Sequence, residues 1–63
     1  MPMYQYKLVR ADGTTEAIMR LSLADEDTAA DRAVEILAAS EAATVEVWQG
    51  LHLVFEAGQT RRD

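Results

Sequence analysis

The residues of this chain that are able to do chemistry are few and scattered. His52 is the single histidine, cysteine is absent, and the serines are Ser22 and Ser40. A catalytic histidine needs a second group to orient it, and the strand alternation around His52 turns it away from the predicted core. Both serines flank a predicted helix, where capping accounts for them, and neither lies in a Gly-x-Ser-x-Gly turn. We therefore expect no catalytic residue and no enzyme activity.

The acidic run Asp25-Glu26-Asp27 is the strongest candidate for binding a divalent cation. It lacks the alternating ligands, central glycine and distal glutamate of a calcium-binding loop. Negative charge is also favoured at the N-terminus of a helix, which explains the run better. Gly13, Gly50 and Gly58 are isolated from one another, so no phosphate-binding loop is present. The sequence therefore predicts neither a metal site nor a cofactor.

Length and charge restrict the classes of partner. A chain of 63 residues buries only about 60% of the surface that its unfolded form exposes, and small domains without disulfides often gain stability by oligomerising. The net charge of −5 and the scattered basic residues disfavour nucleic acid. The apolar runs are too short to span a bilayer, and the first residues do not resemble a secretory signal. We expect a cytoplasmic protein with no membrane partner.

A helix from about Asp25 to Ser40 is predicted from the spacing of apolar residues. Either Asp25 caps it, or Ser22 does so with Asp25 completing a capping box. The inward face is mostly alanine, which lets the helix axis approach a sheet closely. The predicted apolar stripe consists of Ala30, Ala33, Val34 and Leu37, widened by Ala29 and Ile36.

Two alternating segments before the helix, 3–10 and 14–21, predict a β-hairpin. Asp12-Gly13 suits a two-residue type I′ turn. That loop pairs Leu8 with Ala17 and brings the apolar residues of both segments onto one face, with Tyr6 opposite Met19 and Tyr4 opposite Leu21. A three-residue loop would set Leu8 opposite Glu16 and mix the faces, which a half-buried sheet penalises.

A second hairpin follows the helix, with segments 43–48 and 51–56 on either side of Gln49-Gly50. Keeping both apolar sets on one face requires a loop of odd length. A loop of residues 48–50 pairs Val47 with Leu51, and a loop of residues 49–51 pairs Val47 with Leu53. We favour the first because it places Gly50 at the left-handed position of a bulged turn, and the second remains open.

The elements predict an α+β fold of two layers in the order ββαββ, a four-stranded, mostly antiparallel sheet of two hairpins with the helix packed on one face. A ubiquitin-like β-grasp arrangement is the alternative. We expect a single domain over residues 1–56 and a flexible tail over residues 57–63. The predicted core face consists of Tyr6, Leu8, Ala17, Met19, Leu21, Val45, Val47, Leu53 and Phe55.

Several short patterns resemble a group of small bacterial proteins of alphaproteobacterial type that share the ββαββ order. The patterns are the opening Met-Pro-x-Tyr, the Asp12-Gly13 turn, the alanine-rich helix and the sequence Val-Glu-Val-Trp-Gln-Gly over residues 45–50. The resemblance extends from Met1 to Phe55. It implies a fold but no activity.

The face opposite the predicted core offers the best candidate for function. It is expected to carry apolar residues among charged ones, which suits an interface. We expect a protein-interaction module that self-associates as a homodimer through this face or a strand edge. The alternatives are a binder of small molecules with a pocket formed between protomers, and an acidic regulator of a basic protein. The predicted interface residues are Val9, Ile18, Trp48, His52 and Val54.

Overall fold

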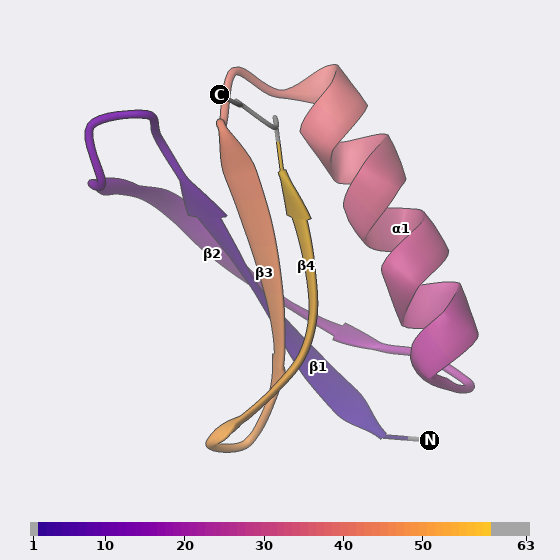
Figure 1. Ribbon diagram of the computed structural model, residues 1–63. Coiled ribbons are helices and arrows are strands. Elements are labelled where there is room, and N and C mark those ends of the chain that lie inside the picture. Colours follow the sequence, from indigo (N-terminus) through magenta and orange to yellow (C-terminus); the bar gives the residue numbers. More distant parts are fainter. Residues whose placement is uncertain (1, 59–63) are drawn as a thin grey trace.

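The computed structural model describes residues 2–58, which form four strands and one helix (Figure 1). The strands make one sheet in the order β2-β1-β3-β4, and each neighbouring pair is antiparallel. This confirms the predicted ββαββ fold, and no parallel pair like the central one of a β-grasp sheet occurs among these residues. The elements are β1 (Met3–Val9), β2 (Thr15–Ser22), α1 (Glu26–Ala39), β3 (Thr44–Gln49) and β4 (His52–Gly58).

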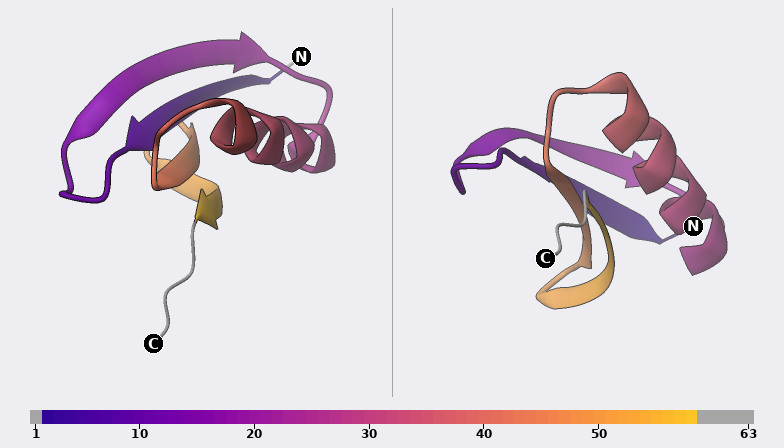
Figure 2. Two further views of the ribbon diagram at one scale, coloured as in Figure 1. Left: turned by 90° about the horizontal axis from the view of Figure 1, so that it is seen from above. Right: turned by 45° about the horizontal axis from the view of Figure 1, so that its top comes forward.

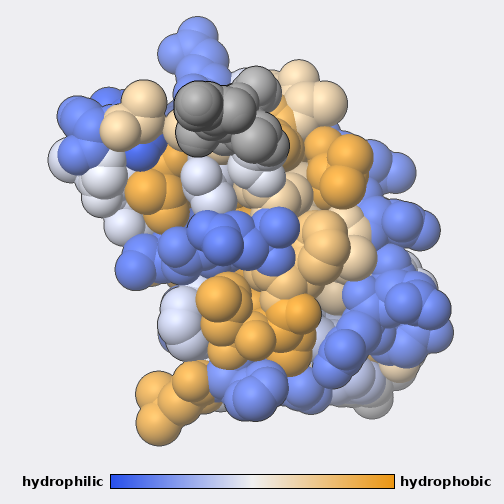
Figure 3. Space-filling view, viewed as in Figure 1, coloured by the Kyte–Doolittle hydropathy of each residue, from blue (hydrophilic) through white to orange (hydrophobic). Residues whose placement is uncertain are grey.

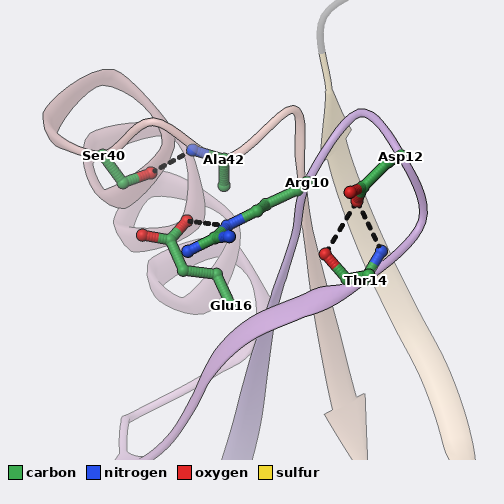
Figure 4. Close-up of polar contacts among 6 residues, drawn as sticks. All are labelled: Arg10, Asp12, Thr14, Glu16, Ser40 and Ala42. Atoms are coloured by element: carbon green, nitrogen blue, oxygen red, sulfur yellow. Dashed lines mark hydrogen bonds and ion pairs between the residues drawn. The ribbon is translucent and has the colours of Figure 1, made fainter.

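Asp25 begins the helix, as the first of the two capping alternatives predicted. Its Oδ1 accepts a hydrogen bond of 2.8 Å from the backbone N–H of Thr28. Hydrogen bonds from the backbone and the side chain of Thr28 stabilise the carboxylate and lower the pKa of Asp25. At the other end, Ser40 Oγ accepts a hydrogen bond of 3.2 Å from the N–H of Ala42 (Figure 4). Asp25 thus caps the start of the helix, and Ser40 orders the turn that follows its end.

The buried side of α1 is centred on Ala29 and Ala33, both without exposed surface. Ile36 and Leu37 are partly buried beside them. Val34, which the sequence pattern placed in the buried stripe, is 54% exposed. The stripe is therefore turned relative to the prediction, because the small alanines lie nearest to the sheet and the larger residues flank them.

The helix covers only part of the sheet. α1 packs on β3 and β4 and approaches β1, but its backbone does not come close to that of β2. Figure 2 shows β2 at the outer edge, with β1 between it and the rest of the fold. Ala17 and Met19 on β2 were expected beneath the helix and are exposed instead. The buried core consists of Tyr4, Tyr6, Leu8, Ala29, Ala33, Ala42, Val45, Val47 and Ala57.

The first hairpin has the predicted pairing but a different turn. Leu8 lies opposite Ala17, as expected. The loop, however, has three residues, because the Arg10 N–H donates to the Thr14 carbonyl and the Gly13 N–H donates to the Arg10 carbonyl. Gly13 alone has a positive φ, +92°, so the type I′ prediction is wrong. A bulge on β2 near Glu16 restores the register that a three-residue loop would have shifted.

Side chains brace this turn (Figure 4). Asp12 Oδ1 accepts hydrogen bonds from the N–H of Thr14 at 3.0 Å and from its hydroxyl at 2.7 Å. These bonds lower the pKa of the Asp12 carboxyl. Across the strands, Arg10 Nε lies 4.0 Å from Glu16 Oε1, an ion pair at the limit of contact. Asp12 therefore acts in the turn through its side chain, which accounts for its place before the glycine.

The second hairpin contradicts both predicted loops. Gln49 lies opposite His52, which leaves a two-residue loop of Gly50 and Leu51. Gly50 has φ +65° and Leu51 a negative φ, the pattern of a type II′ turn. A bulge at Val54 then sets Val47 opposite Phe55. The one-residue shift that keeps the apolar residues of both strands on one face therefore comes from the strand and not from the loop.

This bulge changes the core. Leu53, predicted to be buried, lies opposite Trp48 on the other face and is 43% exposed. β4 also continues to Gly58, with Ala57 buried, so ordered structure extends two residues past the predicted domain end. The remainder of the predicted tail lies outside the described residues.

Tyr6 joins the two layers and is the first residue to test. Its side chain is fully buried, and its hydroxyl donates a hydrogen bond of 2.8 Å to the Ala29 carbonyl. Burial raises the pKa of Tyr6, which keeps the hydroxyl protonated as a donor, although Arg32 partly opposes this. We expect Tyr6→Phe to lower the free energy of unfolding by about 1 kcal/mol, the net value of one such bond.

Urea unfolding followed by tryptophan fluorescence measures this change. Tyr4→Phe is the matched control, since Tyr4 is also buried but no hydrogen bond from its hydroxyl is found within residues 2–58. Equal effects of the two substitutions would contradict a specific role for the bond to Ala29.

Substitutions of Gly13 test the backbone conformation of the first turn. A Cβ at this position would meet no atom within 4 Å, so a substitution reports the backbone conformation alone. We expect Gly13→Ala to destabilise the protein by about 1 kcal/mol because an L-residue rarely adopts a positive φ. Gly13→Asn should cost less, since asparagine tolerates this region best among the other residues. Equal unfolding midpoints for the wild type and Gly13→Ala would exclude the observed turn.

Candidate interaction surface

The face of the sheet opposite α1 carries no covering element among the described residues. We call it the open face. Cross-strand pairing arranges it in rows, because residues opposite one another share a face. One row contains Ile18, Lys7, Glu46 and Glu56, and the next contains Arg20, Gln5, Trp48 and Leu53. Val9 with Thr15 and Thr44 lies on one side of these rows, and Met3 with Ser22 on the other.

Charges are mixed with apolar groups on the open face. Lys7 lies between Ile18 and Glu46, and Glu46 lies directly opposite Glu56. Like charges at opposite positions destabilise a sheet. Trp48 Nε1 donates a hydrogen bond of 3.0 Å to Glu46 Oε1, which orients the indole along the face. Glu46 is thus tied to the tryptophan on its own strand.

The structure brings three of the five predicted interface residues onto this face. Val9 and Trp48 are half-buried there, and Ile18 is 55% exposed. His52 lies opposite Gln49 at the hairpin end, so alternation turns it to the side away from Trp48. Val54 is the extra residue of the β4 bulge and packs against the core. The predicted placement of His52 and Val54 on the open face is wrong because it assumed a strand without a bulge, and a role for either residue in an interface stays a prediction.

Sequence patterns missed the exposure of β2 and of the second hairpin. Every residue of β2 except Leu21 is exposed, including Met19 on the side that faces the helix layer. Leu51 is fully exposed at the hairpin tip, and Figure 3 shows apolar surface at that end of the molecule. The sequence contained one signal for the exposure of β2. It predicts only one short helix, which is too narrow to cover a sheet of four strands.

The alternative of a small-molecule binder would use the rings of Tyr4, Tyr6, Trp48 and His52, which divide between core and surface. Tyr4 and Tyr6 are buried beneath the helix. Burial, together with the carboxylates of Glu26 and Asp25, raises the pKa of Tyr4. Both tyrosines therefore serve packing, and only Trp48 and His52 of the proposed set remain on the surface.

Metal binding and membrane insertion find no support in the described part of the chain. Residues 2–58 contain no cluster of three or more histidine or acidic side chains placed to hold a metal ion. Nor does α1 have the length and apolar character needed to cross a bilayer.

Comparisons with known proteins add no information on function. No protein-family model, curated protein or solved structure matches the chain. The resemblance to small alphaproteobacterial proteins stays a prediction.

The acidic pair on the open face gives a test of its electrostatics. We expect Glu56→Gln to raise the free energy of unfolding by about 0.5 kcal/mol, because it removes the repulsion from Glu46. Glu41→Gln is the control, since it changes the net charge equally at an exposed position outside the sheet. The two variants are compared in urea at low salt. A gain that is no larger for Glu56→Gln than for Glu41→Gln would contradict cross-strand repulsion.

Proposed function

We propose that this protein is a small cytoplasmic interaction module that acts as a homodimer, formed through β2 and the adjoining open face. The observation that carries the proposal is the exposure of β2 on both faces. Ile18 is exposed on the open face, and Met19 is 36% exposed on the opposite face. Apolar residues exposed on both sides of one edge strand are typical of a strand that pairs with another chain.

The size of the core supports self-association. One helix with an alanine face covers fewer than four strands, and the chain has no cysteine with which to form a disulfide. Addition of a second sheet at β2 would satisfy the free backbone groups of that edge and bury apolar side chains on both faces. Both effects favour the folded dimer over two separate chains.

Molar mass in solution tests the proposal. Light scattering from micromolar to near-millimolar protein should give the mass of two chains at the upper end of the range. We expect Ile18→Glu to shift the equilibrium to monomer, because it buries a charge in the interface. Leu51→Glu is the matched control at the fully exposed hairpin tip and should leave the mass unchanged. The mass of one chain at every concentration would refute self-association.

A further inference from the structure

We propose that the second copy adds to β2 in one specific register, with the β2 strands antiparallel about a two-fold axis at Ile18. Glu16 of each copy then lies opposite Arg20 of the other. This inference rests on the self-association proposed above and defines its geometry. It follows from the free backbone groups of β2, from the signs of its charges, and from the apolar residues between them.

The hydrogen-bonding pattern shows which backbone groups are free. The N–H of Leu23 donates to the Pro2 carbonyl at 3.1 Å, in register with the pairing of β1 and β2. In an antiparallel ladder the direction of the backbone groups alternates along each strand. The odd-numbered residues of the regular part of β2 therefore face β1, and Ile18, Arg20 and Ser22 present their N–H and C=O groups at the free edge.

Two-fold symmetry limits the possible registers. When a strand pairs antiparallel with a copy of itself, the residues whose backbone groups point outward bond to each other. The two-fold axis then passes midway between one residue and the same residue of the other copy. At Ile18 the outward groups of both copies can bond directly. Ile18 is the first residue past the bulge whose backbone groups face outward, and the regular pairing continues from it to Ser22.

The charges select this register among the others. Glu16 and Arg20 lie two residues before and after Ile18 and have opposite signs. An axis at Ile18 therefore forms two opposite-charge pairs, one on each side. An axis at Glu16 or at Arg20 would set like charges opposite each other. An axis at Ala17 or Met19 would place neither Glu16 nor Arg20 across from a residue of the opposite charge.

The same register matches the apolar residues on both faces. Ile18 meets Ile18 on the open face, and Ala17 meets Met19 twice on the face that carries the helices. These residues are exposed in the single chain because α1 does not reach β2. Since the axis is perpendicular to the sheet, the dimer has eight continuous strands with both helices on one side. Pairing thus places apolar side chains of the two copies next to one another on both faces of the two β2 strands.

The other edge of the sheet lacks these features. The bulge of β4 lies at Val54 in the middle of the strand, whereas that of β2 lies near its start, and β4 has one acidic residue, Glu56, and no lysine or arginine. Self-pairing of β4 therefore has no complementary charges. Strand edges that avoid pairing often carry charged side chains, but the two opposite charges of β2 are spaced to attract a second copy.

Charge reversal tests the register. We expect Arg20→Glu and Glu16→Arg each to raise the dimer dissociation constant about tenfold or more, the effect of two cross-strand charge pairs of ordinary strength. The double variant should return to within about threefold of the wild type, because the pairs re-form with exchanged signs. Glu56→Arg, a reversal at the opposite edge, is the control and should leave dissociation unchanged.

Amide hydrogen exchange, measured by NMR on the full chain, gives an independent readout. The N–H groups of Ile18 and Arg20 should exchange more slowly as the protein concentration rises. Arg20→Glu leaves the contact of Glu16 with Arg10 intact, so a failure of Glu16→Arg to fold does not remove the test. Dimers without charge sensitivity or protection at Ile18 would overturn this register but not self-association. Monomers at all concentrations would overturn both.

Discussion

The contact of Tyr6 with the alanine side of α1 is the interaction on which the rest of the structure depends. The tyrosine is buried in one core with Ala29 and Ala33, and its hydroxyl bonds to the helix backbone. This contact fixes which sheet face is buried. An α-helix is about 10 Å wide and neighbouring strands are about 4.8 Å apart, so one helix covers two or three strands. The outermost strand, β2, is left without cover for this reason.

The need to keep apolar residues on one face also decides the local geometry of both hairpins. In each, the loop length differs by one residue from the length that simple pairing predicts, and a bulge restores the alignment. A shift by one residue would turn a whole strand over and expose its apolar side chains, whereas a bulge disrupts the ladder at one place. Bulges thus reconcile the preferred turns of Gly13 and Gly50 with the core.

The exposed edge follows from these two constraints. β2 is long, regular beyond its bulge, and apolar on both faces, which in an isolated monomer invites aggregation. The proposed two-fold partner would resolve the conflict because the two β2 edges would pair with each other. Opposite charges at equal distances from Ile18 would make the pairing specific, and the acidic surface elsewhere would limit further association.

The sequence by itself determined the elements and the faces of most residues. Alternation placed Tyr6, Leu8, Val45 and Val47 in the core, and the capping pattern offered Asp25 or Ser22 as the helix cap, of which Asp25 is the one observed. These signals are local, since they depend on periodicity and on hydrogen bonds between neighbours in the chain.

Only the tertiary structure decided the order of the strands, the bulges and the extent of the helix cover. Leu53 lies at the surface and Val54 contacts the core because a bulge in β4 costs less free energy than a strand with its apolar face exposed. Met19 stayed exposed because α1 lies over β3 and β4 and not over β2. Each of these outcomes is a competition between distant parts of the chain for the same buried area, which no local pattern contains.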